Sequence, residues 1–126
     1  MIANNVDITK SIISKISREV LGKRKDPIVG LREIYGLLSY GELTENENYN
    51  TISAIVDETE TVVKEDIRDN FSQGYLEEQD KFEKEYLEEN KFIISRILKN
   101  LSGFPIIDNN FTEPEDPYAW PFEEYR

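Results

Sequence analysis

The sequence predicts an all-α protein: a four- or five-helix bundle organised on one long helix at about residues 72–102, with an extended C-terminal segment rich in proline and aromatic residues. Apolar residues recur every three to four positions through most of the chain, which is the spacing of one helical face. Residue types that begin and end helices punctuate this pattern. A length of 126 residues, with 38% apolar and 33% charged residues, is typical of one soluble helical domain.

The first two helices are predicted in the N-terminal third of the chain. An apolar face repeats between Asn5 and Leu21, and Gly22 follows as a stop signal. The second helix is expected to begin after Asp26, a good N-cap residue, and to end near Gly41. A short basic link joins the two helices.

Two glycines, Gly30 and Gly36, lie inside the apolar pattern of the second helix. Each glycine costs about 1 kcal/mol relative to alanine in a helix interior. Close packing of another helix is therefore the expected reason for both.

A third helix is predicted from about Thr44, because Thr44 and Glu47 have the spacing of a capping box. Its apolar pattern breaks at residues 57–61 and resumes at Val62. The segment 57–63 is compatible with a helix in poor register, a loop or a short strand, since its β-branched residues also favour strands. A helix is favoured because the sequence shows no partner strand.

The long helix is predicted between Ser72, a good N-cap, and Gly103, a C-cap that precedes Pro105. At about 1.5 Å per residue it is roughly 45 Å long, so other helices must lie against it. Its apolar residues are expected to form one stripe that packs within the molecule. They are Tyr75, Leu76, Phe82, Tyr86, Phe92, Ile93, Ile94, Ile97, Leu98 and Leu101.

The C-terminal segment, residues 104–126, differs from the helical domain at residues 1–103. It holds four of the five prolines, which helix interiors do not tolerate, and six of the fourteen aromatic residues. Disordered segments are usually poor in aromatic residues, so we expect an extended strap packed over the bundle. An acidic, aromatic peptide that docks on another protein and a disordered tail are the alternatives.

The net charge of −11 is unevenly distributed. Residues 1–40 carry +3, with seven Lys or Arg against four Asp or Glu, whereas residues 41–126 carry −14, with eight against twenty-two. Such a surface repels phosphate backbones, which disfavours nucleic-acid binding, and attracts a basic protein partner. Solubility alone is the other explanation of the acidity. The candidate partner-binding residues are Glu45, Glu47, Asp57, Glu58, Glu60, Glu113, Glu115, Asp116 and Trp120.

The chain has no histidine and no cysteine, which excludes the usual triad base, thiolate chemistry and the common zinc ligands. No catalytic residue, metal or cofactor is predicted. Asp57, Glu58 and Glu60 nevertheless form a dense carboxylate cluster, and they allow a divalent-metal enzyme with oxygen ligands as an alternative. The structural explanation of the cluster is a pairing of Asp57 or Glu60 with Arg32 or Arg68.

The chain shows no membrane signal. No apolar run approaches the roughly 18 residues needed to span a bilayer, and the N-terminus lacks the order of a signal peptide. A cytoplasmic location without membrane contact is therefore expected. The width of the apolar stripe on the long helix favours packing within one chain, so we expect a monomer or a weak dimer.

A further pattern runs from about residue 17 to about residue 101. It comprises Gly22, Asp26, Gly30, Arg32, Asp57, Glu58, Thr59, Glu60, Ile67, Arg68, Leu76 and Asp80. This order resembles a family of small uncharacterised bacterial helical proteins, in which a Ser-Glu-Thr-Asp-like segment lies between helices and precedes an arginine and an acidic helix. The resemblance implies a compact helical domain, and it implies no activity and no functional residue.

Together these observations favour a non-enzymatic, acidic protein-binding module. An immunity-type protein that neutralises a basic toxin is its most concrete version, because charge steering speeds the capture of a basic nuclease. The metal-dependent enzyme and a structural or oligomerising helical protein are the alternatives.

Overall fold

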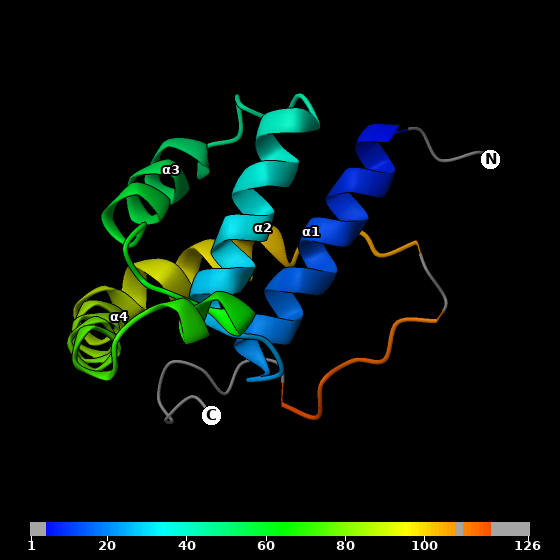
Figure 1. The fold of residues 1–126 in the computed structure, drawn as a ribbon. Coiled ribbons are helices and arrows are strands. Elements are labelled where there is room, and N and C mark those ends of the chain that lie inside the picture. Colours follow the sequence, from blue (N-terminus) through cyan, green and yellow to red (C-terminus); the bar gives the residue numbers. More distant parts are fainter. Residues whose placement is uncertain (1–4, 108–109, 117–126) are drawn as a thin grey trace.

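The computed structural model describes residues 5–107 and 110–116, and the side chains of residues 65 and 66 lie outside this description. The described residues form four α-helices and one 3-10 helix, without a strand (Figure 1). The predicted all-α class is therefore confirmed. The helices are α1 (Asn5–Leu21), α2 (Pro27–Tyr40), α3 (Tyr49–Glu58), the 3-10 helix η1 (Glu65–Asn70) and α4 (Gln73–Leu101).

The core lies where α1, α2 and the C-terminal half of α4 meet. α1 and α2 run side by side, α4 crosses behind both, and α3 packs on α2 (Figure 1). Isoleucine, leucine and valine side chains from these helices fill the space between them, and burying each one contributes about 1.5–3 kcal/mol. The fully buried ones are Ile13, Val20, Leu21, Ile28, Leu31, Ile34, Leu38, Ile52, Ile94, Ile97, Leu98 and Leu101.

The predicted bounds of α1 and the predicted cap of α2 are confirmed. Asp26 Oδ1 accepts hydrogen bonds from the backbone N–H groups of Ile28 at 2.8 Å and Val29 at 3.2 Å. These bonds satisfy two of the backbone N–H groups that have no partner within the first turn of α2. Pro27, also in that turn, has no N–H group and so needs no partner. The local sequence alone therefore determines where α2 begins.

The two glycines of α2 differ in their surroundings. A Cβ atom at Gly30 would lie 2.4 Å from Val20 Cγ2, so α1 and α2 approach closely there, as predicted. A Cβ atom at Gly36 would meet nothing within 4 Å. The predicted close packing at Gly36 is therefore wrong, and this glycine lies on an open surface.

The predicted start of the third helix at Thr44 is wrong, because α3 begins at Tyr49. Residues 41–48 form turns instead. Asn46 Oδ1 accepts a hydrogen bond from the backbone N–H of Asn48 at 2.9 Å, a local bond that competes with helix formation. The capping-box spacing of Thr44 therefore does not decide the local structure.

The predicted continuation of a helix through residues 57–63 is also wrong. α3 ends at Glu58, a turn follows, and residues 62–64 belong to no helix or strand, with the backbone of Lys64 extended. Arg32 stabilises this ending, because its Nη2 atom donates to the carbonyl oxygens of Thr59 at 2.8 Å and Val62 at 2.9 Å. A side chain of α2 thus satisfies carbonyls that a longer α3 would have paired internally.

α4 begins as predicted, since Ser72 Oγ accepts a hydrogen bond from Tyr75 N at 3.2 Å. The expectation of one packed stripe along the whole helix is wrong. The buried residues of α4 all lie between Ile94 and Leu101, whereas Phe82, Phe92 and Ile93 are exposed. A helix of 29 residues is about 43 Å long, and α1 covers only its C-terminal part (Figure 1).

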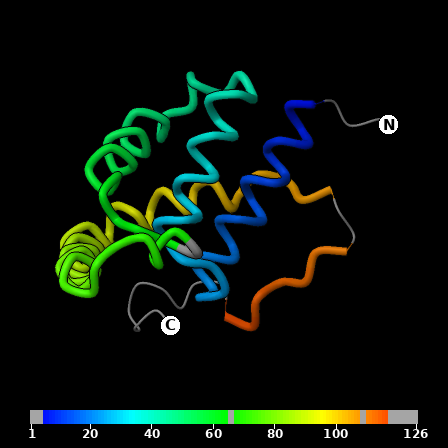
Figure 2. Tube along the Cα trace, viewed as in Figure 1, coloured from blue at the N-terminus to red at the C-terminus, as the bar shows by residue number. Residues whose placement is uncertain are grey.

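The described part of the C-terminal segment is an extended strap along α1 (Figure 2). Ser11 Oγ accepts a hydrogen bond from Ile107 N at 3.0 Å, and Arg24 Nη1 donates to the carbonyl oxygen of Thr112 at 2.9 Å. Pro114 is buried against Gly22, where a Cβ atom would lie 2.4 Å from the proline. The predicted strap thus holds for the described residues, and residues 117–126 lie outside them.

Candidate functional site

A half-buried ion cluster joins α2, the segment after α3 and α4. Lys64 Nζ lies 2.6 Å from Asp26 Oδ2 and 2.5 Å from Glu83 Oε2, and none of the three side chains is more than 17% exposed. Burial opposes the charge of Lys64, but its hydrogen bonds to both carboxylates outweigh burial and raise the pKa of Lys64. At Glu83 the balance is reversed: burial outweighs the hydrogen bond to Lys64 and raises the pKa of the carboxyl.

This cluster stabilises the fold and presents no free group to a ligand. Lys64 bonds both carboxylates, and Asp26 also caps α2. The Lys64–Glu83 pair thereby holds the segment after α3 against α4. The nearby Arg68 adds a bidentate pair, with both its terminal nitrogens 2.9 Å from the Asp80 carboxylate, and it donates to the Val63 carbonyl at 3.1 Å.

The predicted pairing of Arg32 or Arg68 with Asp57 or Glu60 is therefore wrong. Arg32 donates to the backbone carbonyls that end α3, and Arg68 pairs with Asp80 of α4. Both arginines donate to backbone carbonyls within residues 59–63, close to the acidic cluster, so they contact its backbone surroundings and not its carboxylates.

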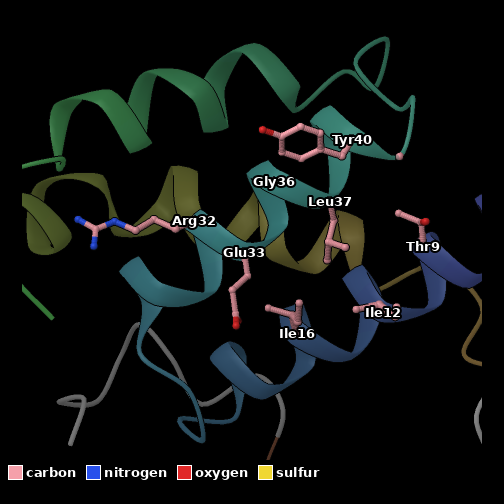
Figure 3. A pocket seen from close by; sticks show the side chains of 9 residues that line it. Thr9, Ile12, Ile16, Arg32, Glu33, Gly36, Leu37 and Tyr40 are labelled. Carbon is pink, nitrogen blue, oxygen red and sulfur yellow. The ribbon is translucent and has the colours of Figure 1, made fainter. Parts of the chain in front are cut away.

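A shallow groove of about 560 Å³ lies between α1 and α2 (Figure 3). Ile12, Ile16 and Leu37 provide its apolar surface, Gly36 leaves it open, and Tyr40 stands at one end with 93% of its surface exposed. The groove can therefore accept apolar groups of a ligand or partner.

The charged side chains beside the groove are already engaged. Arg32 points away from it toward the end of α3, and Glu33 forms an ion pair with Lys25 at 2.6 Å (Figure 3). Thr9 Oγ1 donates to the Asn5 carbonyl at 2.9 Å. These contacts leave the lining without an acid–base pair of the kind that general catalysis needs.

The carboxylates that suggested a metal site do not converge. Asp57, Glu58 and Glu60 are exposed at the end of α3, and Glu58 Oε1 accepts a hydrogen bond from the Tyr86 hydroxyl at 2.5 Å. Among the side chains that the structure describes, which exclude those of residues 65–66, no three Asp or Glu form a group that could hold a metal ion. The arrangement of the described residues thus gives the metal-enzyme alternative no geometric support.

The predicted partner-binding residues lie in three separate places. Glu45 and Glu47 precede α3, whereas Asp57, Glu58 and Glu60 lie at its end, so the ten residues of α3, about 15 Å, separate the two groups.

The tail acids lie in the third place, on the strap beside α1. Glu113 Oε1 pairs with Arg18 Nη1 at 2.8 Å, and Glu115 and Asp116 are exposed. Trp120 lies outside the described residues. No single site therefore unites the predicted set.

Instead, one face of α4 combines apolar and acidic groups, and we name it the acidic–aromatic face. Its apolar row consists of Tyr75, Phe82, Tyr86 and Ile93. Beside this row, on the same helix, lie Glu78, Glu85 and Glu89, which are all exposed. On its other side lies Glu58, to which the Tyr86 hydroxyl donates. The turn that carries the exposed Glu60 contacts α4 through Thr61, whose Oγ1 atom donates to Gln79 Oε1 at 2.9 Å.

Comparison of the chain with protein-family models, curated proteins and solved structures finds no match. In the part of the chain that the structure describes, no helix is long and apolar enough to cross a membrane. Function is therefore inferred from the geometry and charge of the chain itself.

The sequence contains a signal for the acidic–aromatic face that the prediction missed. Apolar residues along α4 occupy two neighbouring lines, one ending in the buried Ile94 and Leu98 and one passing through Phe82 and Ile93. The prediction merged these lines into a single stripe. Only their separation, about 100° around the helix axis, distinguishes the core line from the exposed one.

Proposed function

We propose that this chain is a non-enzymatic, acidic module that binds a basic protein partner, and that its most specific form is an immunity-type protein that neutralises a basic toxin. One observation carries this proposal: a set of exposed carboxylates has no ion-pair partner among the described residues. The set comprises Glu45, Glu47, Glu60, Glu78, Glu85 and Glu89.

No ion pair among the described residues stabilises the fold through these carboxylates. Glu85 and Glu89 are four residues apart on α4, where two like charges cost a few tenths of a kcal/mol. Asp26, Asp80 and Glu83, in contrast, are bonded to basic side chains. A basic partner would relieve the repulsion among the unpaired carboxylates, and their field would accelerate its association.

The geometry of the described residues supports binding over catalysis. The groove between α1 and α2 is apolar, and the charged residues beside it, Arg32 and Glu33, already have partners. The carboxylates of Asp57, Glu58 and Glu60 do not form a group that could hold a metal ion. Such surfaces are suited to another macromolecule more than to a small reacting molecule.

The test is affinity capture with the tagged full-length chain from its native lysate, at about 50 mM and about 500 mM salt, where screening differs strongly. We expect a basic protein that is retained at low salt and lost at high salt. A captured protein that is acidic, or whose binding does not depend on salt, would contradict the proposal. Capture of no protein at low salt would also count against it.

A structural or oligomerising role predicts a different result. Sedimentation of the purified chain should then give a mass above that of a dimer. A monomer or weak dimer is expected from the proposed binding role.

A further inference from the structure

We infer that the acidic–aromatic face of α4 is a docking surface for a basic, amphipathic helix of a partner protein. This inference rests on the proposed function, which it narrows to one surface and one partner chemistry.

Two members of the apolar row, Phe82 and Ile93, are exposed although they belong to a well-formed helix, and the other two, Tyr75 and Tyr86, are half-buried. Phe82 is 37% exposed and Ile93 is 42% exposed, while the buried side of α4 begins only at Ile94. Phe71 stacks on Tyr75 with ring centroids 5.2 Å apart and extends the row beyond the start of α4. Aromatic side chains that stay accessible beside charged residues are typical of the centre of a protein interface.

The spacing of the row matches a helical partner. Residues 75, 82, 86 and 93 are separated by seven, four and seven positions, which keeps them on one side of α4 over 18 helical steps. Eighteen residues of helix span about 27 Å, so a partner helix of similar length could contact the whole row. An extended strand would have no exposed sheet edge to join, because the described residues contain no strand.

The charges on the two sides of the row define the partner's chemistry. Glu78, Glu85 and Glu89 line one side. Glu58 lines the other, held near the row by the Tyr86 hydroxyl, and Glu60 is exposed in the turn that follows. A complementary helix therefore carries an apolar stripe with Lys or Arg along both of its edges.

The same charges argue against two other occupants. In a two-fold dimer through this face, Glu85 and Glu89 of one copy would approach the acidic residues of the second copy, which is unfavourable. An anionic membrane surface would be repelled for the same reason. A basic helix is the occupant that gains from both the apolar row and its acidic edges.

The probe is a fluorescently labelled 18-residue helical peptide of leucine and lysine, with leucine along one stripe and lysine on both edges. A peptide of the same composition in scrambled order is its control. Binding to the full-length protein is measured by fluorescence anisotropy at low salt. We expect the helical peptide to bind about tenfold more tightly than the scrambled one, because only it can align both the apolar stripe and the charges.

Two pairs of substitutions locate the binding surface. Glu85→Lys with Glu89→Lys changes the face, whereas Glu45→Lys with Glu47→Lys makes the same change in net charge before α3. We expect the first pair to weaken helical-peptide binding about tenfold and the second pair by less than about threefold, since local charges matter more than net charge. Phe82→Ala with Ile93→Ala should weaken binding about fivefold without loss of helical circular dichroism, because both side chains are exposed.

Each contrary result has a distinct meaning. Equal weakening by the two charge pairs would overturn the assigned surface and leave the proposed acidic binding module standing. Equal affinity for the helical and scrambled peptides would overturn the inference that the partner segment is a helix. If the wild-type chain sediments as a dimer and Phe82→Ala with Ile93→Ala makes it a monomer, the face binds a second copy and the inference is overturned. The lysate capture decides the proposed function separately.

Discussion

Lys64 Nζ lies 2.6 Å from Asp26 Oδ2, while the other oxygen of the same carboxylate caps α2. One aspartate thereby links the start of α2 to the segment that follows α3, 38 positions later in the sequence. The cap is a local interaction, whereas the ion pair depends on the tertiary fold. The two oxygens of Asp26 can therefore be tested separately.

Asp26→Ala is expected to lower the free energy of unfolding by about 2–3 kcal/mol, because it removes the helix cap and one partner of a half-buried lysine. Asp26→Asn keeps a side-chain oxygen for the cap and loses only the charge, so we expect a loss of about 1 kcal/mol. Chemical denaturation at neutral pH gives both values. Equal losses in the two variants would show that the cap contributes nothing.

Glu83→Gln should change how stability depends on pH. Burial, opposed by the hydrogen bond to Lys64, raises the pKa of Glu83 above its ordinary value of 4.5. Between 4.5 and this higher pKa the folded protein binds more protons than the unfolded chain, so the free energy of unfolding falls as pH rises through that window. Glu83→Gln removes this contribution. The free energy of unfolding of the variant should therefore fall less steeply with rising pH in that window than that of the wild-type protein.

The measurement is chemical denaturation at several pH values from about 4 to about 7, the range in which a raised carboxyl pKa acts. The exposed Glu89→Gln is the matched control, and it should keep the slope of the wild-type protein. An unchanged slope in Glu83→Gln would contradict the proposed effect of burial at Glu83.

The two glycines of α2 provide a comparison within one helix. Gly30→Ala places a Cβ atom 2.4 Å from Cγ2 of Val20, a stiff and fully buried side chain, so α1 and α2 must separate. We expect a loss of about 1–3 kcal/mol in the free energy of unfolding. Gly36→Ala meets nothing within 4 Å and should stabilise the protein by about 0.5–1 kcal/mol through helix propensity.

Thermal or chemical denaturation of both variants checks this contrast. Stabilisation by Gly30→Ala would show that the helices tolerate separation. Destabilisation by Gly36→Ala would show that the groove surface is less open than the structure indicates.

The features predicted correctly from the sequence are those that local interactions determine. The bounds of α1, the cap at Asp26 and the cap at Ser72 each depend on residues within one helical turn. The ending of α3 depends instead on Arg32, whose carbonyl partners lie 27 and 30 residues away. Sequence periodicity carries no signal for such a contact.

The candidate site was harder to predict because it depends on which part of α4 the other helices cover. An apolar residue on a helix has the same spacing whether a second helix packs on it or leaves it exposed. Ile93 and Ile94 are adjacent in the sequence, yet the first is exposed and the second buried. Conversely, the sequence marks Glu58 only through its acidic neighbours, and the contact with Tyr86 places it beside the aromatic row.

Arg18 joins the end of α4 to the C-terminal strap, which yields the last prediction. Its Nη2 atom donates to the Ser102 carbonyl at 2.9 Å, and its Nη1 atom pairs with Glu113 at 2.8 Å. Arg18→Ala should lower the free energy of unfolding by about 2 kcal/mol, because a half-buried charge-assisted hydrogen bond is lost with the ion pair. Glu113→Gln removes only the exposed pair and should cost less than about 1 kcal/mol.

Hydrogen exchange distinguishes loss of the strap from general destabilisation. The amide of Ile107 donates to Ser11 Oγ, so its protection reports whether the strap lies on α1. In Arg18→Ala we expect the exchange rate of the Ile107 amide to increase more, relative to the wild-type protein, than that of the core residue Leu98. The reason is that the strap can detach while the helices stay packed. Ser11→Ala should accelerate exchange at Ile107 directly. Uniform acceleration at both positions in Arg18→Ala would mean that Arg18 stabilises the bundle as a whole and that the strap has no independent opening.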